Sequence, residues 1–315
     1  MGGISVKPQP VPAAIPGPKL AALQRRVVRE IVASSAGVRA TGDPDRERLV
    51  ARVVLQQIKL LQDRDRRRQA LRERILSVVE DGSLRAVFQP IVDVESGIPV
   101  GVEALARFRC EPVRSPDQWF AEARTVGLGR ELEMAALRAA VTQMRRLPRG
   151  MFIAVNVSPQ LLTSSALWTL LAEVDPARLV LEITEHSRIR HYSRIQDVAD
   201  GLRGMGVRLA VDDVGAGFAS LRHVLVLRPD LIKLDVSITR DVDTDPARQL
   251  LIASILAFAA EMSTTVVAEG VETVDEMASL RDLGIRYAQG FGFGRPTSLA
   301  GASRPGRLAL TSTRT

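Results

Sequence analysis

Segments typical of strands alternate with segments typical of helices from residue 86 onward, and this order restricts the fold more than any other feature. The expected strands lie at Ala86–Val94, Pro99–Arg107, Met151–Val157, Leu179–Thr184, Val207–Val211, Leu231–Leu234, Thr264–Ala268 and Ile285–Ala288. The expected helices lie at Pro116–Arg146, Pro159–Glu173, Arg194–Leu202, Leu221–Val226, Pro246–Met262 and Val274–Leu283. Helical crossovers favour parallel pairing, so the sequence predicts an α/β fold, a (β/α)8 TIM-like barrel.

The first two expected strands depart from this rule. They are joined only by Glu95, Ser96, Gly97 and Ile98. A crossover between parallel strands needs about a dozen residues or more. We therefore expect the first strand to run antiparallel to the second.

The N-terminal part differs in composition from the barrel. Residues 1–18 are proline-rich and predict a disordered tail, residues 19–71 a helical N-terminal or linker region, and residues 301–315 a C-terminal tail. Asp43 suits an N-cap with Pro44 at the first helical position, so residues 44–80 should form one long helix or two abutting ones. Such a helix suggests a homodimer or a signal-transmitting role, although its heptads are too broken for a coiled coil.

The charge balance favours anionic partners. The formal net charge is +7 and the pI about 10.4, which suits nucleotides, nucleic acid or an acidic membrane surface. The densest charge run, residues 63–68, has no interleaved aromatic residues for base stacking, so we do not expect nucleic acid as a partner. The longest apolar run, from Leu250 to Ala260, is too short to span a bilayer. With no secretory signal evident, we expect a cytoplasmic protein.

Two adjacent acids, Asp212 and Asp213, end one of the apolar segments. Neighbours on a strand point to opposite faces, so both acids can serve one site only if the chain bends there. Gly215 and Gly217 follow at once and permit a bend, because glycine tolerates positive φ. On its own this pattern also fits a strand-end turn with solvated acids.

Other expected strands also finish on polar residues, which would converge at the C-terminal mouth of a barrel. The set is Glu103, Asn156, Glu182, Asp212, Asp213, Lys233, Glu269 and Gln289. Carboxylates with an amide oxygen, and without histidine or cysteine, are the ligands of Mg²⁺, Mn²⁺ or Ca²⁺ rather than zinc. Because so many carboxylates at one rim would repel one another, the pattern predicts a bound divalent cation.

The motifs that carry these residues resemble the EAL domain, the phosphodiesterase of the bacterial second messenger cyclic di-GMP. The signature stands as Glu103-Ala104-Leu105-Ala106-Arg107. Further matches are Phe88-Gln89-Pro90-Ile91, Asn156-Val157-Ser158, Leu181-Glu182-Ile183-Thr184-Glu185, Asp212-Asp213-Val214-Gly215-Ala216-Gly217, Ile232-Lys233-Leu234-Asp235, Glu269-Gly270-Val271-Glu272 and Gln289-Gly290-Phe291. Their order is highly specific, and the resemblance covers residues 72–300 as an EAL phosphodiesterase domain.

The resemblance implies a role for each residue. Glu103, Asn156, Glu182 and Asp212 would bind one Mg²⁺ or Mn²⁺ ion, and Asp213 would help to hold a second. Lys233 and Glu269 would position and activate water, and Glu185 would anchor the loop after the aspartate pair. Gln89, Leu105, Arg107, Asp235, Glu272 and Gln289 would contact cyclic di-GMP. The product would be linear pGpG.

The loop after the aspartate pair departs from the family pattern. Val214, Ala216, Phe218 and Ala219 stand where the family favours an aromatic ring and hydroxyl groups. Fewer anchoring hydrogen bonds could slow turnover or raise the demand for metal. An alternative function is therefore a weak or inactive EAL domain that acts as a cyclic di-GMP receptor or regulatory adaptor. A third and weaker alternative, which the lack of aromatic residues in the charge run disfavours, is a nucleic-acid-binding regulator that uses the basic N-terminal helices.

Overall fold

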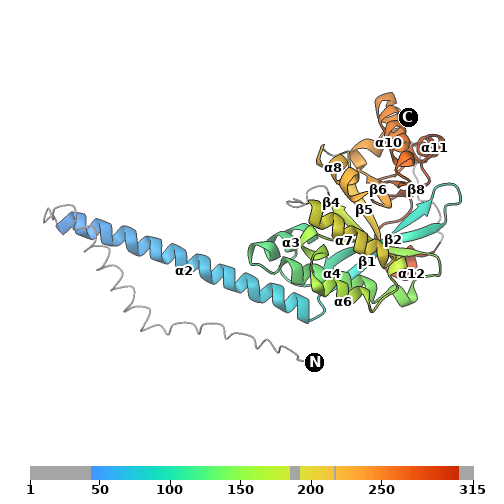
Figure 1. Cartoon of the computed structure of the whole chain (residues 1–315). Coiled ribbons are helices and arrows are strands. Elements are labelled where there is room, and N and C mark those ends of the chain that lie inside the picture. Colours follow the sequence, from blue (N-terminus) through green and yellow to red (C-terminus); the bar gives the residue numbers. More distant parts are fainter. Residues whose placement is uncertain (1–43, 185–191, 216–217, 305–315) are drawn as a thin grey trace. The chain divides into compact units, whose positions relative to one another are not determined.

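The computed structural model describes residues 44–184, 192–215 and 218–304. Within these ranges the strands form a closed barrel in which each strand pairs with the next and the last returns to the first (Figure 1). They are β1 (Leu84–Asp93), β2 (Pro99–Phe108), β3 (Phe152–Asn156), β4 (Leu179–Thr184), β5 (Arg208–Val214), β6 (Leu231–Leu234), β7 (Thr265–Ala268) and β8 (Tyr287–Gln289). The predicted (β/α)8 barrel is confirmed.

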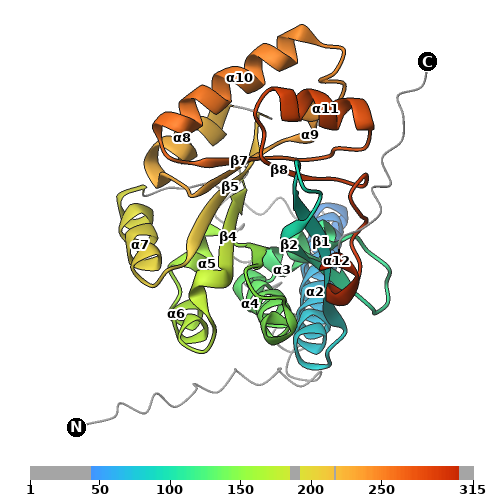
Figure 2. The same ribbon diagram turned by 90° about the vertical axis from the view of Figure 1, so that its right-hand side faces the viewer.

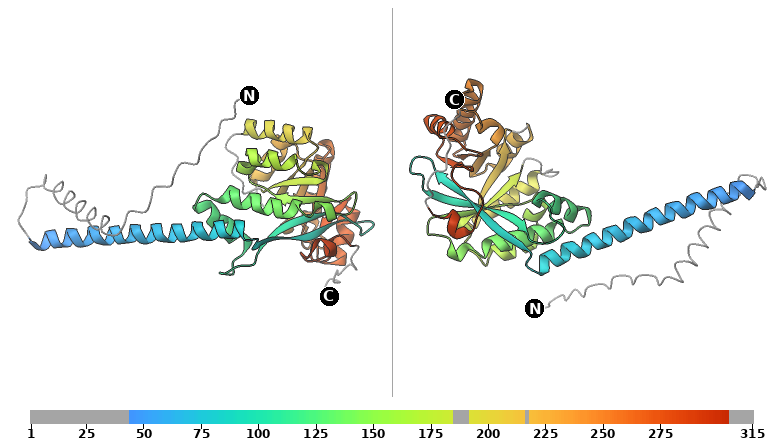
Figure 3. Two further views of the ribbon diagram at one scale, coloured as in Figure 1. Left: turned by 90° about the horizontal axis from the view of Figure 1, so that it is seen from below. Right: turned by 180° about the vertical axis from the view of Figure 1, so that it is seen from behind.

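The first strand runs against both of its neighbours, as the short connection predicted. β1 pairs antiparallel with β2, with Gln89 opposite Glu103, and antiparallel with β8, with Ile91 opposite Gln289. The remaining neighbours, from β2 to β8, pair in parallel. Figure 3 shows the long β1–β2 pair in teal. This pair brings side chains of β1 into the same layer as the ends of the parallel strands.

Helices surround the sheet of the barrel (Figure 2). They are α3 (Pro116–Thr125), α4 (Gly129–Val141), η2 (Met144–Arg146), α5 (Pro159–Leu162), α6 (Ser165–Leu171), η3 (Pro176–Arg178), α7 (Tyr192–Gly204), α8 (Phe218–Leu227), α9 (Val236–Thr239), α10 (Pro246–Glu261), α11 (Val274–Asp282) and α12 (Leu299–Ala302). The prediction of single helices over 116–146 and 159–173 was wrong. The first breaks at Gly127, which has φ +77°. The second breaks where Ser164 caps a new helix.

The barrel interior follows the two-residue period of a strand. Its apolar layer contains Ile91, Phe152, Ala154, Val180, Ala210, Leu231 and Val267. Two residues further along the parallel strands the inward positions become polar, as at Glu182 after Val180 and Asp212 after Ala210. The apolar layer therefore forms a floor below a polar layer at the C-terminal mouth.

The helix α2 (Pro44–Glu80) is continuous, which decides between the two predicted arrangements. The chain divides into the units Met1–Ala70 and Leu71–Thr315. Within the second unit, Ile75 and Val78 are buried with Trp119 and Leu132, so the last turns of α2 belong to the packing of the barrel unit. Among the described residues, no helix combines the length and the apolar composition that crossing a membrane requires.

Candidate functional site

The polar layer has a buried ammonium group at its centre. Lys233 Nζ lies 2.8 Å from Glu269 Oε1, 3.1 Å from Glu182 Oε2, and 3.3 Å from both Glu103 Oε2 and Asp212 Oδ1. Lys233 is 1% exposed and Glu182 is 1% exposed, so water screens these charges very little. The strand ends therefore bring the predicted carboxylates and the predicted amine to one point.

Burial and charge act against each other in this cluster. Burial raises the pKa of Glu182 well above its usual value and also raises that of Asp212, while the nearby Lys233 ammonium opposes both shifts. Burial raises the pKa of Glu269 to about 8. For Lys233, burial favours the neutral amine, but the surrounding carboxylates outweigh it and raise the pKa. The centre thus holds one ammonium together with the carboxyl groups of Glu182, Asp212 and Glu269, which retain protons more readily than in water.

The chain bends at the paired acids. Asp213 has φ +57°, a left-handed conformation that Asp adopts more readily than most residues, and its backbone N–H donates to Asp212 Oδ1 at 3.0 Å. Gly215 has φ +114°, and a Cβ there would lie 1.8 Å from Ile238 Cδ1. The bend predicted from the glycines begins at Asp213 itself, and Gly215 fits where no side chain could.

Amide side chains complete the polar layer. Asn156 Nδ2 donates to Glu103 Oε1 at 3.0 Å, and Gln289 Nε2 donates to Glu103 Oε2 at 2.6 Å and to Gln89 Oε1 at 3.1 Å. Because the amide nitrogen of Asn156 is engaged, its oxygen is the atom that could bind a cation. The amides orient the Glu103 carboxylate from two sides.

The residues fit a divalent cation. Oxygen atoms of Glu103, Glu182 and Asp212 lie within 4.8 Å of one another, and so do those of Asp212, Asp213 and Glu269. An all-oxygen donor set suits Mg²⁺ or Mn²⁺. The Lys233 ammonium already contacts these carboxylates. Its position is an independent sign that this centre favours positive charge.

Two cavities flank the carboxylate cluster and share Leu105 and Asp212. The first, about 370 Å³, is lined by Gln89, Glu103, Leu105, Asp212, Val236, Arg240, Glu269, Gly270, Glu272, Gln289, Gly290 and Phe291. The second, about 510 Å³, is lined by residues that include Leu105, Arg107, Phe120, Arg124, Glu133, Asn156, Ser158 and Asp212. A ligand with two similar halves could therefore lie across the cluster with one half on each side.

The predicted substrate contacts are divided between these cavities. Gln89, Glu272 and Gln289 line the smaller one, and Arg107 lines the larger one. Asp235 lines neither; its carboxylate accepts from the Ser237 N–H at 2.9 Å and caps α9. The predicted loop anchor, Glu185, lies outside the described residues.

Residues on helices escaped the sequence prediction, which looked at strand ends. Glu133 on α4 accepts hydrogen bonds at Oε2 from Ser158 Oγ at 2.6 Å and from the Ser158 N–H at 3.2 Å. Ser158 follows Asn156 by two residues and caps α5. Glu133 therefore braces the segment that carries a predicted cation ligand. Glu131 lies two residues before it on the same helix, so the local sequence does not single out Glu133.

Residues 68–296 match the family described as EAL domain. The chain belongs to the EAL domain family. The cyclic di-GMP phosphodiesterase PA2567 of Pseudomonas aeruginosa is 33% identical to it over 221 residues, which are 67% of this chain and 38% of that protein. The chain spans about a third of the length of the curated relatives it matches first.

Solved structures agree with this membership. The PaMucR phosphodiesterase in complex with c-di-GMP has a TM-score of 0.65 and 28% identity, and the match covers 74% of this chain and 99% of that chain. BlrP1 of Klebsiella pneumoniae, solved with calcium and cyclic di-GMP, has a TM-score of 0.62 and 31% identity over 68% of this chain and 56% of that chain. BlrP1 has also been solved with manganese and the same dinucleotide.

Proposed function

We propose that this EAL domain, residues 72–300, hydrolyses cyclic di-GMP to linear pGpG with the help of Mg²⁺ or Mn²⁺. The observation that carries the proposal is the buried cluster of Glu103, Glu182 and Asp212, which opens between two cavities. The choice of dinucleotide is supported by the phosphodiesterase relatives and by the structures that contain it.

The carboxylates and Asn156 would hold the cations, with Asp213 contributing to a second one. When bound, such ions lower the pKa of a water molecule and neutralise charge on a phosphate. This restricts the work of the remaining side chains to positioning and proton transfer.

Glu269 suits the role of general base. Its carboxylate lies in the cluster, 2.8 Å from the Lys233 ammonium, and would take a proton from the reacting water. The oxygen of that water forms a bond to phosphorus, and the P–O3′ bond breaks. The departing O3′ gains a proton, so the products are a 3′-hydroxyl and a 5′-phosphate on one linear dinucleotide.

Lys233 and Arg107 would act without accepting protons. Lys233, with its pKa raised by the surrounding carboxylates, stays an ammonium and donates to the groups around the reacting water. Arg107 lines the larger cavity and would hold a phosphate oxygen with its planar, permanently charged group.

A cyclic di-GMP receptor or adaptor is the second candidate. Val214, at the end of β5, buries an apolar side chain where the family favours an aromatic one. This departure next to the aspartate pair is the observation that favours a receptor. A receptor would bind the dinucleotide tightly and leave it intact.

Incubation of the purified protein with cyclic di-GMP and Mn²⁺, followed by chromatography, separates these functions. The phosphodiesterase proposal expects pGpG from the natural chain and none from Glu103→Ala, because that change removes a cation ligand. Tight binding without pGpG favours the receptor. Undiminished turnover by Glu103→Ala means that the site is assigned wrongly.

A further inference from the structure

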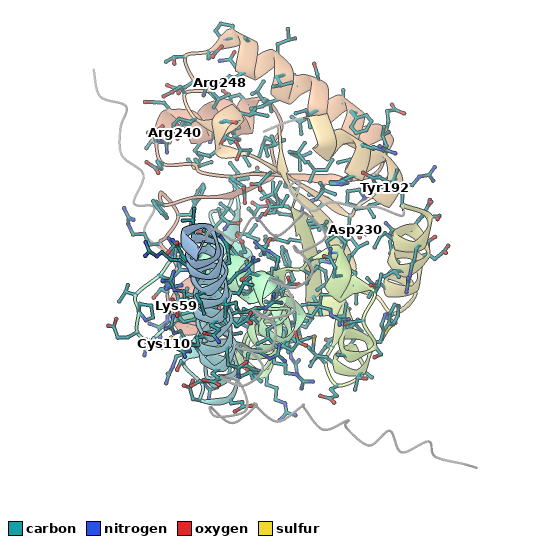
Figure 4. The ribbon with its side chains drawn as sticks, turned by 90° about the vertical axis from the view of Figure 1, so that its left-hand side faces the viewer. Lys59, Cys110, Tyr192, Asp230, Arg240 and Arg248 are labelled. Atoms are coloured by element: carbon teal, nitrogen blue, oxygen red, sulfur yellow. The ribbon has the colours of Figure 1, made fainter. Side chains whose placement is uncertain are left out.

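The smaller cavity contains an arginine to which the sequence pattern assigned no role. Arg240, just after α9, extends Nη2 to within 3.1 Å of Glu272 Oε1, and both side chains line the cavity that opens on Asp212 and Glu269. Figure 4 labels Arg240 close to Arg248, whose guanidinium donates to the backbone carbonyl of Arg240. The backbone that carries Arg240 is thereby held, while its side chain faces the cavity.

The pair of Arg240 and Glu272 can be opened by a ligand. Their side chains are 50% and 44% exposed, and salt bridges at such exposure contribute little to stability. A ligand that offers one group to the guanidinium and another to the carboxylate can replace the pair without leaving either charge unpaired.

A second observation concerns a buried hydrogen-bond acceptor in the lining of the cavity. Gln289 is 4% exposed, and within the described part of the chain its Oε1 has no hydrogen-bond partner. The orientation of the amide is fixed, because Nε2 donates to Gln89 Oε1 and to the Glu103 carboxylate. A buried acceptor without a partner is costly, and a small movement of the cavity lining would let a ligand N–H or O–H reach it.

The cavity also offers an aromatic face. Phe291 is 43% exposed and lines the cavity, and the Arg295 guanidinium lies 4.1 Å from the centre of its ring. Aromatic rings and guanidinium planes are surfaces on which nucleobases stack. The volume of about 370 Å³ is near the lower end for ligand pockets, which suits one nucleotide half of a dinucleotide.

These groups match the edges of guanine. Guanine presents O6 and N7 as acceptors, which an arginine binds in a bidentate manner, and its amino group donates. Adenine places an amino group where guanine has O6, so it would set a donor against the arginine donors. We propose that Arg240 reads O6 and N7 of the guanine in this cavity, while Glu272 accepts from the N–H groups, and that the pair selects guanine over adenine.

The role of Arg240 rests on the proposed function, and the experiment separates the two. Binding and turnover are measured for cyclic di-GMP, cyclic di-AMP and the 7-deaza analogue of cyclic di-GMP, which lacks N7. Arg240→Ala should raise Kd and lower kcat/KM for cyclic di-GMP by roughly 5- to 150-fold, the range expected for a bidentate base contact. The same change should leave both values for cyclic di-AMP unaltered. Arg240→Lys should recover only part of the loss.

The 7-deaza analogue supplies the sharpest comparison. The natural protein should bind it more weakly than cyclic di-GMP, and Arg240→Ala should bind the two equally. Arg286→Ala is the matched control, since Arg286 is an exposed arginine paired with Asp93 at 3.7 Å outside the cavity, and it should keep full guanine preference. Equal losses of both cyclic dinucleotides in Arg240→Ala overturn the proposal. Guanine-selective binding without hydrolysis would refute the phosphodiesterase and leave the role of Arg240 intact.

Discussion

Replacement of Lys233 by methionine tests the electrostatics of the carboxylate cluster. The variant removes the ammonium that contacts Glu103, Glu182, Asp212 and Glu269, and it retains a side chain of similar length. Removing one partner from a buried ion pair costs roughly 3–5 kcal/mol, because the other charge stays buried and unpaired. For a domain of this size that loss lowers Tm by roughly 6–20 °C.

Thermal unfolding in EDTA and in saturating Mn²⁺ measures this effect. In EDTA the variant should unfold at a much lower temperature than the natural protein. In Mn²⁺ the difference in Tm between the variant and the natural protein should be smaller, since the cation supplies positive charge to the same carboxylates. Turnover by the variant should remain low. Lys59→Met, at an exposed position on α2, is the control and should change neither value. Equal Tm values for Lys233→Met and the natural protein in EDTA would refute the reasoning.

Three further predictions follow from the same geometry. First, in EDTA the free energy of unfolding should fall by up to about 5 kcal/mol between pH 4.5 and pH 8. The reason is that Glu269 keeps its proton up to a pKa of about 8 in the folded protein, whereas it loses the proton at lower pH in the unfolded chain. Urea unfolding in EDTA that gives a constant or rising free energy over this range contradicts the prediction. Second, Glu133→Ala should raise the Mn²⁺ concentration needed for half-maximal activity roughly 10-fold by loosening Ser158, with Ser158→Ala giving a similar shift and the double variant no more; an unchanged Mn²⁺ titration would remove Glu133 from the site. Third, Gly215→Ala should destabilise the turn by roughly 1–3 kcal/mol, because its Cβ would meet Ile238 at a left-handed φ; a natural Tm and natural turnover would show that the turn adapts.

The barrel and its polar mouth were largely predictable from the sequence. Short apolar runs mark the strands, and the polar residue that follows each run marks the end of the strand. The two-residue period of a strand places alternate side chains inside the barrel. Glu103, Glu182, Asp212, Lys233 and Glu269 therefore converge as the pattern predicted. The antiparallel first strand followed from the length of a single connection.

Helix breaks and helix-borne site residues were not predictable in the same way. Residues 116–146 have helical spacing throughout, and only the left-handed Gly127 shows where the chain turns. Glu133 acts through a contact with Ser158 that no local pattern encodes. Asp235 was predicted to contact substrate from its position in a motif, and the sequence prediction did not include its cap of α9. Its contact with substrate stays a prediction.

Exposed apolar side chains on α2 bear on the predicted homodimer. Leu49, Leu60 and Leu61 are each more than half exposed on this helix. Exposed leucines on one helix are consistent with association of two copies, and the homodimer stays a prediction. Sedimentation of the full chain would test it, with Leu60→Glu and Leu61→Glu expected to favour the monomer.

Hydrolysis in ¹⁸O-labelled water tests the central claim most directly. If the carboxylate cluster holds cations that activate a water molecule against cyclic di-GMP, the sole product in Mn²⁺ is pGpG with one ¹⁸O in its 5′-phosphate, and EDTA abolishes it. Mass spectrometry that finds intact cyclic di-GMP, or pGpG without the label, contradicts the account.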